Sequence, residues 1–313
     1  MKIMVFDVGG TEIKYSVMDE QMHRTDSGAV PTPQDTQAQF LDAVYRLYAP
    51  HKDEVSGIAM ALPGFVDNRT GYVSNGGALL YNTATPVGQL LAEKCGCPVI
   101  LENDGKAAAM AELANGALKD CCNAAVFIIG TGVGGGIIAN GQLVRGVHFT
   151  AGEYSFVNTN AEAWDAPDQN MACQCSTSNL LKWYRARKVL PEDAPLDGRS
   201  FFAAANAGEP EALEVLRRFC HAVAVQIYNL TVLLDVEKVA IGGGISKQPL
   251  LLENLRSAYD GLYASRAGQA YMEGLPRCQI VPCAFSSEAN QVGVAAAYFE
   301  AIPVSYTHLR AHE

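Results

Sequence analysis

Apolar residues along the chain form short continuous runs and longer stripes at helical spacing. The short runs predict strands at Lys2–Phe6, Lys14–Met18, Val55–Ala61, Pro98–Leu101, Asp235–Ile241 and Ile280–Cys283. The stripes predict helices at Thr36–Tyr48, Val87–Lys94, Gly105–Ala114, Leu180–Arg187, Glu211–Leu234 and Asn290–Ala301. Strands and helices are therefore interleaved, as in an α/β protein.

One stretch, Val126–Gln142, combines apolar strand residues with a dense run of glycines and reads VFIIGTGVGGGIIANGQ. Glycines in a turn let backbone N–H groups approach an anion closely, because no Cβ intervenes. Residues 130–135 match the dinucleotide fingerprint G-x-G-x-x-G, but a second strand and an Asn140–Gly141 turn follow where that fingerprint requires a helix. No Lys-Ser/Thr pair closes the run, which argues against a Walker P-loop. We expect a phosphate-binding hairpin; a purely structural hairpin is the alternative.

The chain begins with a second copy of this plan. Val5–Gln21, which reads VFDVGGTEIKYSVMDEQ, aligns without gaps on Val126–Gln142, so that Gly9 is opposite Gly130. A repeated unit of strand, glycine turn and strand indicates two related lobes. Two such hairpins facing each other would hold a polyphosphate between them.

Several side chains near these turns are candidate nucleotide ligands. Asp7 ends the first strand, where its carboxylate can meet the Mg²⁺ of a nucleotide or simply cap the turn. Thr11 can bond a phosphate oxygen, and Lys14 can reach one or remain a solvated strand residue. A third glycine turn at Gly243–Gly244 can support the adenosine, or serve only to connect a strand to a helix.

Polar residues after other predicted strands are candidate ligands of a small polar molecule. The Asn75-Gly76-Gly77 turn lets a small polar ligand lie against the backbone, and a plain loop is an equal alternative. Asn103 and Asp104 end a buried strand and begin a helix, where together they can bind a vicinal diol. Asp104 can accept a hydroxyl proton during phosphoryl transfer, or act only as an N-cap. Glu153 follows the central hairpin and offers a second carboxylate, although alone it resembles a surface residue.

Composition limits the classes of function. The 313 residues suffice for two domains, and the formal charge of −10 argues against a nucleic-acid partner. No apolar run is long enough for a membrane span, and the opening MKIMVFDVGG lacks the plan of a signal peptide. Nine scattered cysteines are typical of reduced thiols. We therefore expect a cytoplasmic protein.

Four segments together resemble the ROK (repressor, open reading frame, kinase) family of sugar kinases: DVGGT at 7–11, ENDGKAAAMAE at 102–112, IGTGVGGG at 129–136 and IGGGIS at 241–246. The resemblance implies a two-lobed actin-like, ribonuclease-H-like α/β fold with a nucleotide cleft between the lobes. It also implies ATP and Mg²⁺ as cofactors and Asp104 as catalytic base. The sugar ligands that we infer are Asn75, Gly77, Asn103, Asp104 and Glu153. The inferred nucleotide ligands are Asp7, Gly9, Gly10, Thr11, Lys14, Thr131, Gly132, Val133, Gly134, Gly243 and Gly244.

The expected domains follow from this resemblance. Residues 1–116 form the N-terminal lobe, which a C-terminal helix at about 290–302 completes, and residues 117–289 form the second lobe. Residues 303–313 break the preceding pattern, and we interpret them as sequence foreign to the native protein. The repressors of this family carry an N-terminal helix-turn-helix, for which a chain that opens on the first hairpin has no room.

The chain also departs from the family pattern. Phe156 stands where the family has a histidine that contacts both sugar and zinc, and the cysteine cluster retains only Cys173 and Cys175. Leu180 replaces the third cysteine, and Lys182 replaces a glutamate that often touches the sugar. Two thiolates cannot complete the tetrahedron of structural zinc, so zinc is expected to be absent. The pattern is similar to a zinc-less branch that includes β-glucoside kinases.

The sequence thus predicts an ATP-dependent kinase acting on a hydroxyl of a hexose or β-glucoside. Glucokinase and N-acylmannosamine kinase are the alternatives within this class. A sugar- or nucleotide-binding regulator without turnover is the alternative of another class. A small-molecule sugar is the expected partner, with a homodimer as one expected assembly.

Overall fold

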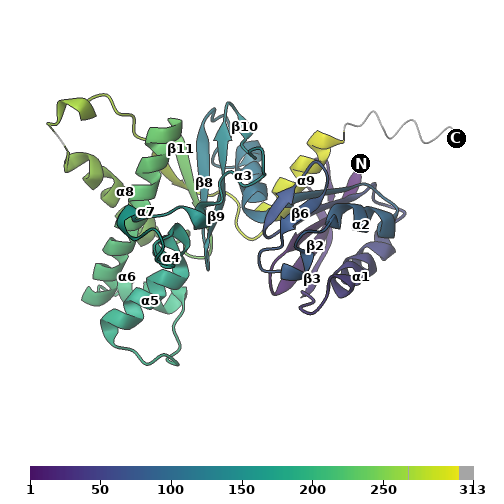
Figure 1. Ribbon diagram of the computed structural model, residues 1–313, viewed down its shortest axis with the longest axis horizontal. Helices are drawn as coiled ribbons and strands as arrows, with labels where there is room; N and C mark the ends of the chain where they lie inside the picture. Colours follow the sequence, from purple (N-terminus) through teal and green to yellow (C-terminus); the bar gives the residue numbers. More distant parts are fainter. Residues whose placement is uncertain (267, 303–313) are drawn as a thin grey trace. The chain divides into compact units, whose positions relative to one another are not determined.

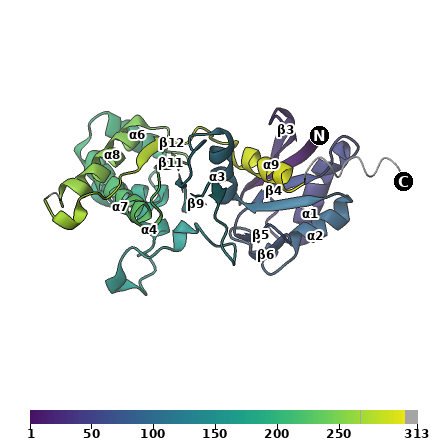
Figure 2. The same cartoon turned by 90° about the horizontal axis from the view of Figure 1, so that it is seen from above.

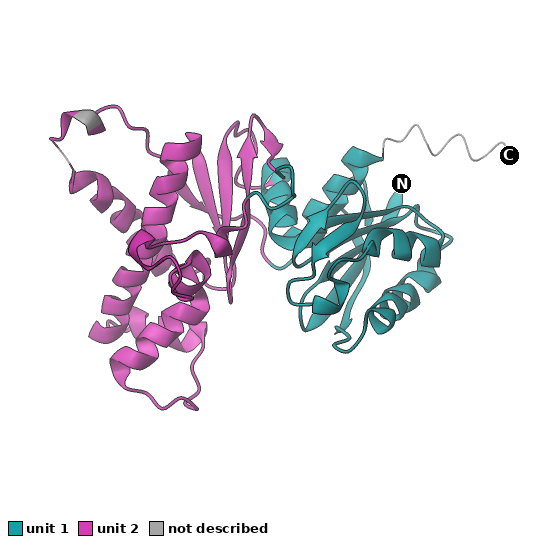
Figure 3. Cartoon of the chain, viewed as in Figure 1, with its two compact units in different colours: residues 1–115, 145–151, 287–313 teal, residues 116–144, 152–286 magenta. Residues whose placement is uncertain are grey.

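The computed structural model describes residues 1–266 and 268–302, so the tail predicted to be foreign, 303–313, lies outside the described residues. The chain divides into two compact units (Figure 3). Of the described residues, unit 1 contains Met1–Asn115, Arg145–Ala151 and 287–302, and unit 2 contains Gly116–Val144 and Gly152–Ser286. The segment Arg145–Ala151, which the predicted division placed in the C-terminal lobe, thus groups with unit 1.

Unit 1 is built on a five-stranded sheet of order β3-β2-β1-β4-β7. Its strands are β1 (Lys2–Val8), β2 (Glu12–Asp19), β3 (Arg24–Pro31), β4 (Ile58–Leu62) and β7 (Val99–Asn103). β1, β2 and β3 pair antiparallel, whereas β1, β4 and β7 run parallel. The carboxyl ends of these three parallel strands therefore lie at one edge of the sheet.

Helices cover both faces of this sheet. They are α1 (Gln37–Tyr48), α2 (Val87–Cys95), α3 (Asp104–Asn115) and α9 (Ala289–Ala301). Phe40 of α1 and Leu91 of α2 share one apolar core with Phe6 of β1. On the other face α9 packs against α3, β4 and β1 (Figure 2), so closely that a Cβ on Gly293 would lie 1.7 Å from the carbonyl oxygen of Ala107. Small residues are needed where these two helices meet.

Unit 2 repeats the strand plan of unit 1. Its sheet has the order β10-β9-β8-β11-β12 and consists of β8 (Ala124–Ile129), β9 (Val133–Ala139), β10 (Gln142–Leu143), β11 (Lys238–Gly242) and β12 (Gln279–Pro282). β8, β9 and β10 pair antiparallel, and β8, β11 and β12 run parallel. The predicted duplication is confirmed, as is the hairpin turn, in which Asn140 and Gly141 both have positive φ.

The helices of unit 2 surround one apolar core. They are α4 (Met171–Cys175), α5 (Thr177–Lys188), α6 (Gly198–Asn206), α7 (Pro210–Leu234) and α8 (Pro249–Ala264). Phe127 of β8 and Ile241 of β11 lie in this core with Leu216 and Phe219 of α7 and Leu255 of α8. α7 and α8 pack against each other beside the sheet (Figure 1). Among the described residues, no helix has both the length and the apolarity that crossing a membrane requires.

Several elements of the structure are absent from the sequence-based prediction, and β3 and α8 are the longest strand and the longest helix among them. β3 is an edge strand in which most side chains are exposed, so its sequence lacks the apolar alternation of a half-buried strand. α8 does carry a helical stripe, because Leu251, Leu255 and Tyr259 are all buried. The sequence of β3 therefore contains no clear strand pattern. The sequence of α8 contains a helical pattern that the prediction overlooked.

Candidate active site

Asp7 lies near the end of β1, at the carboxyl edge of the unit 1 sheet. Its Oδ1 accepts a hydrogen bond from Nδ2 of Asn290 (2.9 Å), and the Nζ atom of Lys14 is 3.9 Å from its Oδ2. Burial raises the pKa of Asp7, while Asn290 and Lys14 act in the opposite direction. A carboxylate oxygen of this kind is the hard ligand that Mg²⁺ prefers.

The turn that follows Asp7 is stabilised by hydrogen bonds to its backbone carbonyl groups. The carbonyl oxygen of Gly9 accepts a hydrogen bond from Oγ1 of Thr32 (2.8 Å), and that of Gly10 accepts one from Nε2 of Gln34 (2.7 Å). The carbonyl oxygen of Thr11 accepts from the backbone N–H of Thr32 (3.0 Å). With the carbonyls engaged in this way, the exposed side chain of Thr11 is presented at the tip of the turn.

Asn103 and Asp104 mark the passage from β7 into α3. Oδ1 of Asn103 accepts a hydrogen bond from the backbone N–H of Lys106 (3.0 Å), so Asn103 is the residue that caps the helix. Its Nδ2 donates to the carbonyl oxygen of Gly64 (2.9 Å). Asp104 is the first residue of α3, and its Oδ1 accepts from the N–H of Gly105 (2.8 Å). The alternative role of Asp104 as N-cap is thus taken by its neighbour.

The Asn75–Gly77 turn packs against the same edge of the unit 1 sheet. It follows β6 (Tyr72–Asn75), which pairs with β5 (Phe65–Asp67) in a small antiparallel sheet. Oδ1 of Asn75 accepts from the N–H of Gly77 (2.8 Å), and a Cβ on Gly64 would lie 2.0 Å from the carbonyl oxygen of Asn75. Since Gly64 also accepts the bond from Asn103, the predicted sugar ligands of unit 1 form one connected group.

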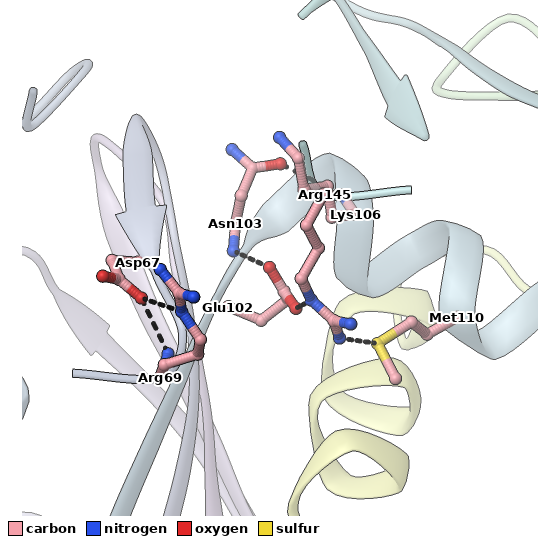
Figure 4. Close-up of polar contacts among 7 residues, drawn as sticks. All are labelled: Asp67, Arg69, Glu102, Asn103, Lys106, Met110 and Arg145. Atoms are coloured by element: carbon pink, nitrogen blue, oxygen red, sulfur yellow. Dashed lines mark hydrogen bonds and ion pairs between the residues drawn. The ribbon is translucent and has the colours of Figure 1, made fainter. Parts of the chain in front are cut away.

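A buried ion pair beside this group was not predicted from the sequence (Figure 4). Nε of Arg145 donates to Oε2 of Glu102 (2.8 Å), and the Glu102 side chain is fully buried. Oε1 of Glu102 accepts from the backbone N–H of Asn103 (3.1 Å). Burial raises the pKa of Glu102, and Arg145 opposes that shift. A glutamate in an otherwise apolar strand was the only signal of this pair in the sequence.

The glycine turn of unit 2, between β8 and β9, is tied to the start of α5. The N–H of Gly130 donates to the carbonyl oxygen of Gly132 (3.0 Å), and the carbonyl oxygen of Gly130 accepts from the N–H of Thr177 (2.8 Å). Val133 is buried, and its N–H already donates to Oγ of Ser155 (3.2 Å). Thr131 is the exposed side chain of the turn.

The backbone requires glycine at some of the glycine positions in unit 2 but not at others. Gly135 and Gly243 have positive φ, and a Cβ on either would lie within 2.2 Å of a backbone carbonyl oxygen. Gly134 and Gly244 have ordinary φ, and a Cβ on either would meet nothing within 4 Å. The fold therefore explains the first pair but not the second. β8 and β11 are parallel neighbours, so both loops follow strands that end at one edge of the sheet.

Glu153 is half-buried and directly precedes a 3₁₀ turn, Tyr154–Phe156, whose Phe156 is 69% exposed. Unit 2 also contains a cavity of about 460 Å³, which is lined mostly by polar residues. The lining residues used below are Thr131, Lys182, Trp183 and Arg218. Phe156, which stands in place of the family histidine, is not among the residues that line this cavity, whereas Lys182 is.

The cysteine segment lies beside this cavity. Cys173 lines it, whereas Cys175 is buried, and burial raises the pKa of Cys175 to about 12. Leu180, at the position of the third family cysteine, is fully buried in the core of unit 2. Within residues 1–266 and 268–302, no three His, Cys, Asp or Glu side chains cluster in a way that would hold a metal ion.

The predicted ligands thus fall into two groups, one in each unit. Unit 1 contains Asp7, Gly9, Gly10, Thr11, Lys14, Asn75, Gly77, Asn103 and Asp104. Unit 2 contains Thr131, Gly132, Val133, Gly134, Glu153, Gly243 and Gly244. In unit 1 the residues after β1 and β7, and in unit 2 the glycine turns after β8 and β11, follow parallel strands at one edge of each sheet, where α/β folds commonly bind ligands.

Comparison with known proteins gives one consistent result. The ROK family profile matches residues 3–300. A β-glucoside kinase of Listeria innocua is 31% identical over 258 residues, covering 82% of this chain and 87% of its own length. A glucokinase of Halalkalibacterium halodurans is 29% identical over 269 residues, covering 77% and 79%. A ROK family protein of Streptococcus pneumoniae, solved in complex with sucrose, superposes with a TM-score of 0.84 at 28% identity, covering 96% of this chain and 99% of its own.

Proposed function

The chain belongs to the ROK family and is a carbohydrate kinase with the family's two-lobed actin-like fold, and from this premise we propose that it transfers the γ-phosphoryl group of ATP to a hydroxyl of a hexose or β-glucoside. One observation carries the proposal. Asp7, near the end of β1, and Asp104, directly after β7, lie at one edge of the same sheet, in which β1 and β7 flank β4. One carboxylate is thereby available to the nucleotide and the other to the acceptor.

Asp104 is the proposed catalytic base. As the sugar oxygen forms its bond to the γ-phosphorus, the bond from phosphorus to the leaving ADP oxygen breaks, and the hydroxyl proton passes to the Asp104 carboxylate. The N–H of Gly105, 2.8 Å from Oδ1, orients that carboxylate. Because the transition state of phosphoryl transfer is loose, orientation of the hydroxyl contributes more than the strength of the base.

The nucleotide is proposed to lie on the glycine turns of both units. Gly134 and Gly244 do not have positive φ, and each has open space at the position of a Cβ. Nothing in the fold of the chain therefore requires glycine at these two positions. A nucleotide in close contact with the backbone would supply the reason. Mg²⁺, held through Asp7, would neutralise charge on the phosphates. The proposed phosphate contacts in unit 1 are Gly9, Gly10, Thr11 and Lys14.

The substrate is proposed to be a β-glucoside whose second ring is itself polar. The lining of the unit 2 cavity contains mostly hydroxyl, amide and charged groups, with Trp183 as an aromatic surface. Sugars bind to proteins through this combination of hydrogen-bonding groups and an aromatic ring. Lys182 in the lining replaces a family sugar contact, and Thr131 links the cavity to the proposed nucleotide site.

Release of ADP with and without sugars tests this function. The sugars are glucose, N-acetylmannosamine, fructose, cellobiose and an aryl β-glucoside, each with ATP·Mg²⁺. We expect ADP only when sugar is present, with kcat/KM for cellobiose about tenfold above that for glucose, a preference of about 1.4 kcal/mol. ADP release without sugar would indicate an ATPase, and no release with any sugar would refute the kinase reaction. A preference for glucose over every glucoside would refute only the role of the cavity.

We also propose a homodimer and no nucleic-acid partner. Val232 and Leu233, near the carboxyl end of α7, are 48% and 76% exposed, and apolar exposure of this kind is common at subunit contacts. The charge of −10 disfavours a nucleic-acid backbone. All nine cysteines are free thiols, which suits a reducing compartment such as the cytoplasm.

A further inference from the structure

Arg145 contacts both elements that flank Asp104 (Figure 4). Its Nε atom donates to Oε2 of Glu102 on β7 (2.8 Å), and its Nη2 atom is 3.4 Å from Sδ of Met110 on α3. Asp104 lies between these contacts, at the first position of the helix. A single guanidinium therefore bridges the strand before the proposed base and the helix after it.

The carboxylate of Glu102 connects Arg145 to the backbone of Asn103. It is fully buried, and its Oε1 accepts from the N–H of Asn103 (3.1 Å). A buried carboxylate needs a paired cation and hydrogen bonds in order to remain ionised. Arg145 is its ion-pair partner, and the charge of Lys106 also favours the ionised form. Loss of Arg145 would leave Glu102 to take up a proton or to move.

A displacement of Glu102 would shift the backbone of Asn103, and with it the adjacent Asp104. Asn103 caps α3 through Lys106 and binds the carbonyl oxygen of Gly64. The first turn of α3 and the loop after β4 thus depend on the same side chain. We infer that Arg145 is a positioning residue for Asp104, acting through the ion pair with Glu102 and the backbone of Asn103. The inference rests on the proposed role of Asp104.

The chain also supplies a matched control. Arg145 begins the segment Arg145–Ala151, which groups with unit 1 between two stretches of unit 2. The ring of Phe149, in the same segment, is buried and lies 4.7 Å from the guanidinium carbon of Arg69. Arg69 pairs with Asp67 rather than with Glu102. Arg69→Met therefore weakens the attachment of the segment and leaves the ion pair of Arg145 in place.

The test compares Arg145→Met, Arg145→Lys and Arg69→Met with the wild-type chain. We expect Arg145→Met to lower kcat about 10- to 100-fold, as small misplacements of a catalytic group do, with KM for ATP changed less than about threefold. Arg145→Lys keeps the charge but loses the planar fork, so we expect it to recover part of kcat and to fold if Arg145→Met does not. Arg69→Met should retain kcat within about twofold.

Hydrogen exchange gives a readout that does not depend on turnover. In Arg145→Met, and more weakly in Arg145→Lys, the amides of Asn103 and Lys106 should exchange at least about tenfold faster, but not in Arg69→Met. Unchanged exchange, kcat of Arg145→Met within twofold of wild type, or an equal loss in Arg69→Met would each overturn the inference. If the wild-type chain shows no sugar-dependent turnover, the proposed function fails, and exchange alone decides whether Arg145 positions Asp104.

Discussion

The two hairpins of this protein have the same plan but offer different chemistry. The β1–β2 hairpin carries charge, since Asp7 lies beside Lys14 and is bonded to Asn290. The β8–β9 hairpin carries no charged side chain and offers backbone, glycine and the hydroxyl of Thr131. Duplication thus preserved the backbone path, which we propose to bind phosphate, and left side-chain chemistry free to differ between the units.

Removing the proposed base from unit 1 should have the largest effect. We expect Asp104→Asn to keep the fold and to lose about 10²- to 10⁴-fold in kcat, because the amide cannot accept the hydroxyl proton. Steady-state kinetics and circular dichroism measure the two effects. Asp260→Asn, which changes an exposed carboxylate of unit 2, is the control. Turnover of Asp104→Asn within threefold of wild type would rule out this role.

A pair of adjacent glycines in unit 2 separates folding from binding. Gly135→Ala should cost more than about 3 kcal/mol in the free energy of unfolding, because the Cβ would lie 1.8 Å from the carbonyl oxygen of Val126. Gly134→Ala has open space. It should therefore change stability by less than about 1 kcal/mol and raise KM for ATP about tenfold. Urea unfolding and kinetics measure both. An unaltered KM in folded Gly134→Ala would mean that this glycine does not face the nucleotide.

The charged hairpin of unit 1 should show its difference in the effect of pH. The hydrogen bond from Asn290 lowers the pKa of Asp7, which burial raises above 3.8, so Asn290 stabilises the ionised carboxylate. Asn290→Ala raises the folded-state pKa further. Its cost is absent where Asp7 is protonated in both states and grows to about 1 kcal/mol as pH rises through the folded-state pKa.

Urea unfolding at about pH 4 and about pH 8 tests this dependence. Asn254→Ala removes a bond to the neutral carbonyl of Leu250 and should cost the same at both values. An Asn290→Ala penalty that does not increase with pH would show that Asp7 is not ionised in the folded protein.

The smallest effect is expected from adding a chelator, because we expect no structural zinc in the protein. Only two cysteines remain in the cluster segment of unit 2, and the core residue Leu180 occupies the third position. We expect less than about 0.1 zinc per chain after purification without chelator, and no change in Tm when chelator is added. About one zinc per chain by elemental analysis would disprove this, and His148→Ala and His221→Ala would then identify the ligand.

Local patterns in the sequence predicted a large part of this fold. Both hairpins followed from apolar runs that flank glycine, and Asn103 and Asp104 from polar residues at the end of a buried strand. β3 was missed because its pairing with β2, rather than its own composition, makes it a strand. The ion pair of Glu102 and Arg145 joins residues 43 positions apart, and Arg145 lies outside any periodic segment. Such a contact depends on tertiary structure, which no local pattern encodes.

The packing of α9 has a consequence for biosynthesis. Residues 1–115 leave the ribosome first, but their sheet lacks the helix that packs on β1 and β4 until residues 289–301 have been made. Tyr298 of that helix is almost fully buried and donates to the carbonyl oxygen of Ser56 (3.3 Å). Unit 2, whose strands and helices are all synthesised in between, can fold earlier. The nascent chain should therefore expose the apolar face of its first sheet throughout that interval, when chaperones bind most readily.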